Sequence, residues 1–254
     1  MGSKIAFSVI TPVLNESNGI REFLNHVREE ADSTPVEIIV VDGDAGGSTI
    51  REIEDDGILA MTGPCGRGAQ MNAGAARASG AILLFLHADT HLPRGAFGAI
   101  AEMLGDESAV GGAFDLSIGS DRPLLRLAAR CASLKHRLTR VPYGDQAIFL
   151  RADFFREIGG FREIPLFEDV ELMKRIRRLK KRIAILPDRV TTSPRKWKSD
   201  GVCFTIIRNL VLQALFMAGV SPALLVKLYY RRSASASNPY PGNAETPGQH
   251  YSND

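Results

Sequence analysis

The sequence is poor in cysteine and has no long uninterrupted apolar run. Its three cysteines, Cys65, Cys131 and Cys203, are far apart and odd in number, so we expect no disulfide framework and no paired-cysteine zinc site. Residues 1–4 contain no apolar segment of the kind that a signal peptide carries, and we expect a cytoplasmic protein. The net charge of +2 argues against a dedicated nucleic-acid-binding protein.

The most apolar segment, residues 202–226, is interrupted by Arg208, Asn209, Gln213 and Pro222. Its uninterrupted parts are shorter than the roughly 20 residues that a membrane-spanning helix needs. We therefore expect helices over residues 201–232 that pack on the core or lie on the inner face of the cell membrane. Residues 233–254 are rich in Ser, Asn, Pro and Gly, a composition that predicts a disordered tail.

Two glycine-rich phosphate-binding motifs are also absent. The first predicted strand leads into residues 11–16, TPVLNE, and lacks the G-x-G-x-x-G turn of dinucleotide-binding dehydrogenases. Residues 43–49, GDAGGST, lack the Gly-Lys-Ser/Thr ending of a P-loop. A phosphate held through a metal ion fits this sequence better than one held by a glycine-rich loop.

Residues 1–200 predict one α/β domain, because strand and helix patterns alternate along them. The first half predicts strands at 5–13, 36–41, 57–61 and 81–86 and helices at 17–31, 49–55, 69–78 and 94–104. The second half predicts strands at 110–118, 146–151, 183–186 and 190–192 and helices at 123–138 and 168–182. This order predicts a mixed, mainly parallel sheet that is flanked by helices.

Asp89 follows the apolar run 81–86, which is typical of a buried strand. Ligands of open α/β sheets bind beyond the carboxyl ends of the strands, and His87 and Asp89 alternate so that both can face one site. A carboxylate beside an imidazole suits a divalent cation that holds phosphates. In the alternative interpretation, Asp89 only caps the next helix.

Further acidic side chains occur where predicted strands end or helices begin, namely Glu16, Asp42, Glu168 and Asp169. Carboxylates gathered at one sheet edge destabilise a protein unless they bind a cation or hydrogen-bond donors of a ligand. Each also has a structural alternative, since Glu16 and Asp169 suit the first turn of a helix. Seven basic residues within 174–182 indicate a solvated helix face rather than a surface for anionic lipids.

Taken in order, these segments resemble the motifs of a family 2 glycosyltransferase with a GT-A fold. The resemblance covers about residues 5–200 and rests on TPVLNE (11–16), VVDG (40–43), GRGAQMNAG (66–74), FLHAD (85–89) and FEDVEL (167–172). The segments GRGAQMN, HADT and YGDQ (143–146) are similar to those of a subgroup associated with radical-SAM and arsenosugar-type gene clusters.

The resemblance implies a role for each matching residue. Asp42 matches the aspartate that accepts the uracil N–H, Arg67 a basic residue near the base or phosphates, and Asp169 the catalytic base. Asp89 matches the last aspartate of the DxD motif, which binds Mn²⁺ or Mg²⁺ on the donor diphosphate. The remaining implied nucleotide-sugar contacts are Thr11, Pro12, Asn15, Glu16 and Ala88.

The sequence departs from the family pattern at two places. His87 replaces the first aspartate of DxD, and imidazole suits Mn²⁺ better than Mg²⁺. The loop 44–49 lacks the usual second aspartate, so contacts to the ribose or base are expected to differ.

The implied activity is inverting transfer of a sugar, with UDP-sugar the favoured donor, to a hydroxyl acceptor that is a small molecule or a lipid. Candidate acceptor contacts are Asp145, Gln146, Glu168, Arg195 and Trp197, although 143–146 also suits a plain turn and the single tryptophan suits packing.

Two other classes of protein remain as alternatives. A sugar-1-phosphate nucleotidyltransferase shares the broad fold, but would normally carry a glycine-rich, basic loop after the first strand. A non-enzymatic nucleotide-sugar-binding protein would keep Asp42 but would have no need for Asp169. Hydrolysis of a nucleotide sugar without an acceptor separates this second alternative from an enzyme.

Overall fold

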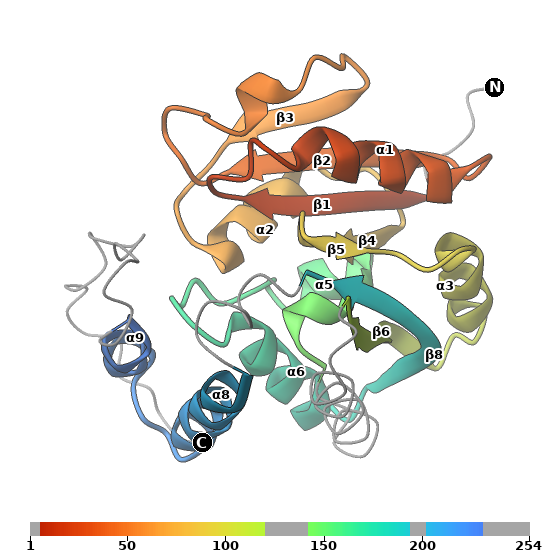
Figure 1. Ribbon diagram of the computed structural model, residues 1–254. Helices are drawn as coiled ribbons and strands as arrows, with labels where there is room; N and C mark the ends of the chain where they lie inside the picture. Colours follow the sequence, from red (N-terminus) through yellow and green to blue (C-terminus); the bar gives the residue numbers. More distant parts are fainter. Residues whose placement is uncertain (1–5, 120–141, 194–201, 231–254) are drawn as a thin grey trace.

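The computed structural model describes residues 6–119, 142–193 and 202–230 (Figure 1). The strands are β1 (Phe7–Val13), β2 (Val36–Asp42), β3 (Ile58–Thr62), β4 (Ile82–Phe85), β5 (Thr90–His91), β6 (Ala109–Ile118), β7 (Ile148–Arg151) and β8 (Arg182–Thr192). The helices are α1 (Ile20–Ala31), α2 (Arg67–Arg77), α3 (Ala96–Leu104), α5 (Ala152–Glu157), α6 (Glu168–Arg178), α8 (Val202–Met217) and α9 (Pro222–Tyr230), with 3₁₀ turns η1 (Ile50–Glu52) and η2 (Gly144–Gln146).

The eight strands form one sheet in the order β3-β2-β1-β4-β7-β6-β8-β5. The first four strands in this order are parallel, and β6 also pairs with β8 in parallel. The pairs β4–β7, β6–β7 and β5–β8 are antiparallel. The mixed, mainly parallel sheet expected from the sequence is confirmed, and β1, β2 and β4 end at one edge of it.

The central strands are apolar at almost every position because helices cover both faces of the sheet. Val9 of β1 belongs to the cluster beneath α1 and α3, whereas the next residue, Ile10, belongs to the cluster beneath α2, α5 and α6. Figure 1 shows α1 and α2 on opposite sides of β1 and β2. At Gly74 a Cβ would lie 2.6 Å from Cγ2 of Ile10, so α2 can lie this close to β1 only with glycine there.

Several predicted boundaries are wrong. The chain forms a turn over residues 17–19, and α1 therefore begins at Ile20. The two short strands predicted at 183–186 and 190–192 are one strand, β8. Its pairing with β6 is interrupted by a register shift at Pro187, which has no N–H to donate, and then resumes. The helix predicted at 168–182 ends at Arg178, and Lys180 has a left-handed φ of 54°.

Some elements were not predicted, and others cannot be compared. β5 and α5 were missed, since two-residue strands and six-residue helices leave little periodicity in the sequence. The helix expected at 123–138 and the tail expected at 233–254 lie outside the described residues.

The C-terminal helix α8 lies beside α6, and α9 packs against α8 (Figure 1). The ring of Phe216 in α8 lies 5.2 Å from the ring of Phe167, which immediately precedes α6. The Tyr143 hydroxyl donates a hydrogen bond to Oε1 of Gln213 in α8. Within the described ranges, no helix has the length and apolar character needed to cross a bilayer.

Candidate active site

A cavity of about 250 Å³ lies between the turn that follows β4, the start of α6 and the C-terminal helices. Its lining includes six of the residues predicted as a site: Arg67, His87, Asp89, Asp145, Glu168 and Asp169. The sequence places these residues up to about a hundred positions apart, and the fold brings them around one space. His87 and Asp89 both line this cavity, and their role in a binding site stays a prediction.

Glu168 and Asp169 begin α6, directly after a residue with a strained backbone. Phe167 precedes the helix with a left-handed φ of 66°. Oδ2 of Asp169 accepts the N–H of Gly144 at 2.6 Å, and Oδ1 accepts the N–H of Val170 at 2.7 Å. Asp169 therefore ties the η2 turn to the start of α6, and its carboxylate also occupies the first helical turn that the structural alternative foresaw.

The two adjacent carboxyls have raised pKa values. Burial, together with the charge of Asp169, raises the pKa of Glu168 to about 7, although the Arg67 guanidinium opposes the shift. Burial also raises the pKa of Asp169, against the N–H groups of Gly144 and Val170 and the charge of Arg67. Carboxyls with raised pKa values inside a cavity are characteristic of groups that exchange protons with a substrate.

Gly144 stands between the imidazole of His87 and the carboxylate of Asp169. A Cβ at this position would lie 3.3 Å from Nε2 of His87 and 3.4 Å from Oδ2 of Asp169. Both functional groups therefore approach the backbone of η2, and a side chain at residue 144 would occupy the space between them.

His87 and Asp89 are the residues that could hold a divalent cation. In the part of the chain that the structure describes, no group of three or more His, Cys, Asp or Glu side chains is arranged to hold a metal ion. A hard cation held jointly with substrate phosphates needs only one or two protein ligands. One carboxylate and one imidazole on the same cavity fit a cation of this kind.

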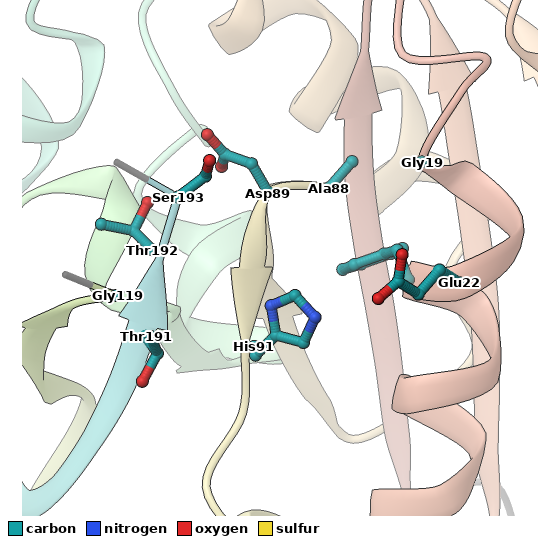
Figure 2. A pocket seen from close by; sticks show the side chains of 10 residues that line it. Gly19, Glu22, Ala88, Asp89, His91, Gly119, Thr191, Thr192 and Ser193 are labelled. Carbon is teal, nitrogen blue, oxygen red and sulfur yellow. The ribbon is translucent and has the colours of Figure 1, made fainter. Parts of the chain in front are cut away.

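Asp89 also borders a second cavity of about 300 Å³, which Figure 2 shows. Glu22 of α1 and His91 of β5 line it together with Ala88 and the end of β8. The helix that follows, α3, begins after Gly95, so the alternative in which Asp89 caps it is wrong. Asp89 instead lies on the turn that separates the two cavities.

Asp42 holds the loop that follows β2. Its side chain is fully buried, Oδ1 accepts the N–H of Asp44 at 2.9 Å, and Oδ2 accepts those of Thr49 and Ile50 at 2.8 and 3.3 Å. A nucleotide base could reach this carboxylate only if the loop moved. The contact of Asp42 with the base stays a prediction, and the role visible in the structure is to shape the loop.

The other predicted nucleotide contacts lie near the same loop. The N–H of Glu16 donates to Oγ1 of Thr49 at 3.1 Å, and because α1 begins only at Ile20, the alternative that put Glu16 in its first turn is wrong. Thr11 is fully buried, Pro12 is half-buried, and Asn15 is exposed with a φ of 59°. These four residues line neither cavity, and their contacts with a donor stay predictions.

Gln146 requires a correction among the predicted acceptor contacts. It is fully buried, its Nε2 donates to the carbonyl of Phe114 at 2.8 Å, and its Oε1 accepts the N–H of Tyr143 at 3.0 Å. These bonds hold the η2 turn on the sheet, so the side chain supports the cavity from beneath and does not reach an acceptor. Asp145 lines the cavity, whereas Arg195 and Trp197 lie outside the described residues.

One wall of the cavity was not predicted. It is formed by the C-terminal helices, through Thr205, Arg208, Asn209, Leu212 and Tyr229. The Arg208 guanidinium lies 4.3 Å from the centre of the Tyr229 ring, a cation–π contact. The first four residues follow the spacing i, i+3, i+4, i+7, which marks one helix face. This spacing is the signal that could have revealed the wall, but Arg208 and Asn209 were interpreted only as interruptions of an apolar run.

The sequence of this chain matches that of a known protein family. The sequence model of the family described as "Glycosyl transferase family 2" matches residues 8–161. No curated protein matches the chain.

Solved structures with a similar fold include a mannosyltransferase and the protein TarS. The mannosyltransferase PcManGT from Pyrobaculum calidifontis, in complex with GDP-Man and Mn²⁺, is 18% identical with a TM-score of 0.62, over 94% of this chain and 68% of that one. S. aureus TarS is 17% identical with a TM-score of 0.56, over 91% of this chain, which spans only 44% of TarS. TarS 1-349 in complex with UDP is 19% identical with a TM-score of 0.56, over 92% and 74%. The expected GT-A fold is thereby confirmed.

Proposed function

The chain belongs to glycosyl transferase family 2, and from this premise we propose that it transfers a sugar from a nucleotide-diphosphate donor to a hydroxyl acceptor. The observation that supports the proposal best is the pair formed by the buried Glu168 and the half-buried Asp169, which shares a cavity with His87, Asp89 and Arg67. UDP-sugar is the favoured donor. The similar structures were solved with UDP in one case and with GDP-Man in the other, so a guanosine donor belongs in the same tests.

Asp169 is the proposed general base. Its carboxylate lines the cavity, and the N–H groups of Gly144 and Val170 fix its orientation. Burial raises its pKa, which makes the ionised carboxylate a better proton acceptor than an exposed aspartate. Asp169 would take the proton of the acceptor hydroxyl while the oxygen attacks the anomeric carbon.

Glu168 and Arg67 adjust the charge around this base. With a pKa raised to about 7, Glu168 is partly protonated at neutral pH, so it does not add a full negative charge beside Asp169. Arg67, at the start of α2, lines the same cavity, and its charge opposes the rise in the pKa of both carboxyls. Its positive charge also suits the negative charge that develops on a departing diphosphate.

Asp89 and His87 would hold Mn²⁺ or Mg²⁺ together with the donor phosphates. Such a cation, when bound, acts as a Lewis acid that stabilises the charge on the leaving nucleoside diphosphate. Replacement of one carboxylate by imidazole leaves less negative charge for a hard cation, which favours Mn²⁺ over Mg²⁺.

The proposed stereochemistry is inversion. A single base that activates the acceptor hydroxyl requires one displacement at the anomeric carbon, with no covalent intermediate on the protein. The two alternatives are less well supported. A nucleotidyltransferase lacks its glycine-rich basic loop in TPVLNE, and a protein that only binds nucleotide sugars gains nothing from a buried carboxyl of raised pKa.

The finer assignments remain predictions. They are membership of the subgroup associated with radical-SAM and arsenosugar-type gene clusters, the chemical class of the acceptor, the domain boundary near residue 200, and a cytoplasmic location at the inner face of the cell membrane.

The proposal is tested by thermal unfolding with UDP or GDP in the presence of Mn²⁺. A nucleotide at 100 times its dissociation constant should stabilise the protein by about 2.7 kcal/mol. Asp89→Ala should abolish the part of this stabilisation that depends on Mn²⁺ and leave the melting temperature without ligand nearly unchanged. Unchanged melting of the unsubstituted protein with both saturating nucleotides would contradict the proposal.

A further inference from the structure

The outward surface of the C-terminal helices is apolar. Eight large hydrophobic side chains are exposed in the described residues, and six of them, 41–60% exposed, belong to α8 and α9: Ile207, Leu210, Val211, Met217, Leu224 and Leu228. The four in α8 are spaced i, i+3, i+4 and i+10, so they lie on one side of that helix. An exposed apolar surface concentrated in this way marks a contact with another body.

The opposite side of α8 faces the active-site cavity and carries polar side chains beside the buried Leu212 and the half-buried Phe216, whose ring packs on Phe167. Thr205, Arg208 and Asn209 line the cavity, and Gln213 accepts the hydrogen bond of Tyr143. A surface helix normally buries its apolar side and exposes its polar side. In α8 the outer side is apolar and the polar groups lie at the cavity, which suits a helix whose outer side contacts an apolar medium while its inner side contacts a polar substrate.

The charge of the C-terminal segment identifies that medium. Residues 174–232 contain 15 of the 31 Lys and Arg residues of the chain, but only two of its 29 acidic residues, Asp188 and Asp200. The side chains of residues 177 and 178 at the end of α6, and of residues 180, 181 and 182 that follow it, are exposed. Nζ of Lys174 lies 5.3 Å from the centre of the Phe216 ring, so the basic half of α6 adjoins the end of α8.

We infer that the outer side of α8 and α9 docks on an anionic lipid bilayer. Apolar side chains flanked by Lys and Arg are the features of a helix that lies in the interfacial plane and is attracted by anionic headgroups. A second copy of the chain is the less suitable partner, because a symmetric contact through this surface would bring the two basic segments together. In this arrangement the basic residues of 174–182 face anionic headgroups, whereas the sequence favoured a solvated helix face.

Docking in this orientation deepens the proposed function, on which this step rests. Because α8 forms both the docking surface and a wall of the cavity, the docked protein would hold its active site beside the headgroups. An acceptor hydroxyl carried by a membrane lipid would then be presented at the cavity.

The test is co-sedimentation of the full chain with vesicles, without nucleotide or metal. We expect binding to phosphatidylcholine vesicles that contain about 30% phosphatidylglycerol, weaker binding at high salt, and none to phosphatidylcholine alone. Leu210→Gln and Leu210→Glu should each reduce binding about tenfold or more, since they remove an inserted aliphatic side chain. The matched control is Leu59→Glu. Leu59 is 39% exposed and lies on β3, and its replacement by glutamate adds the same charge as Leu210→Glu.

Equal vesicle binding by Leu210→Gln and the unsubstituted chain would overturn the inference. A concentration-dependent dimer that Leu210→Glu dissociates, without vesicle binding, would also overturn it and make the surface an interface between copies. Stabilisation by UDP or GDP with Mn²⁺, measured in solution on the same proteins, keeps the two proposals separate. Loss of vesicle binding with that stabilisation intact counts against the docking surface alone.

Discussion

Asp169→Asn is the substitution that separates a catalytic role from a structural one most clearly. Asparagine has nearly the shape of aspartate but cannot accept a proton at neutral pH, so turnover should fall about 10²–10⁴-fold if Asp169 is the general base. That range corresponds to about 2.7–5.4 kcal/mol of transition-state stabilisation.

The structure also sets the size of the structural effect. Asp169 accepts two backbone N–H groups, from Gly144 at 2.6 Å and from Val170 at 2.7 Å. The amide of asparagine offers only one acceptor oxygen, so one N–H must face an NH₂ group or lose its partner, at a cost of about 1–3 kcal/mol in unfolding free energy. Removal of the charge beside Glu168 acts in the opposite direction, because it relieves the repulsion that raises the pKa of Glu168.

The assay is release of UDP or GDP from a nucleotide sugar, with calorimetric nucleotide affinity and thermal unfolding measured in parallel. Asp169→Asn should keep nucleotide affinity within a few-fold while turnover collapses. Two variants in the same cavity serve as controls, Glu168→Gln and Asp145→Asn, and both should retain more turnover.

Two results would refute the reasoning. Substantial turnover by Asp169→Asn would move the base elsewhere, with Asp145 the next candidate. A fall in nucleotide affinity as large as the fall in turnover would show that Asp169 acts through the structure of η2 and the start of α6.

Three further predictions concern the same cavity. His87→Asp should preserve or improve turnover with Mg²⁺ relative to Mn²⁺, because a second carboxylate suits the harder cation. Equal losses of metal affinity in His87→Asp and His87→Ala would show that His87 has another role. Without ligands, the free energy of unfolding should fall as the pH rises from about 4.5 to about 7. In that window Glu168 keeps its proton in the folded state but has lost it in the unfolded chain, where its pKa is the ordinary 4.5. In urea titrations, Glu168→Gln should therefore make the free energy of unfolding less dependent on pH. An equal pH dependence in Glu168→Gln and the unsubstituted protein would assign the effect to another group. Gly144→Ala should lower turnover and have a smaller effect on the free energy of unfolding, since the alanine Cβ would lie 3.3–3.4 Å from His87 and Asp169. Full activity of this variant would show that the space between the two side chains is not used.

Much of the fold followed from local sequence patterns. The apolar runs that became β1, β2 and β4 identify strands buried on both faces, because no side of such a run is polar enough to meet water. The alternation of these runs with helical periodicity is sufficient to predict a mainly parallel sheet. Since parallel strands end at one edge, the positions of Asp89 and His87 after β4 also predicted that they lie at one place, and both line the same cavity.

Other features depended on contacts between residues distant in the sequence. Asp169 meets Gly144 25 positions away, and Tyr143 meets Gln213 70 positions away, so no local periodicity could indicate either bond. The predicted acceptor contact of Gln146 was wrong for the same reason, because its amide is used by the carbonyl of Phe114 on a neighbouring part of the sheet.

The side of α8 that faces inward was likewise decided only by tertiary structure. The sequence determined that residues 202–226 are apolar with a few polar members, which describes a buried helix and an interfacial helix equally well. Packing against α6 and η2 turned Thr205, Arg208 and Asn209 toward the cavity and left Ile207, Leu210 and Val211 exposed. Composition fixes how much apolar surface a helix carries, whereas the direction in which that surface points depends on the neighbours that the fold supplies.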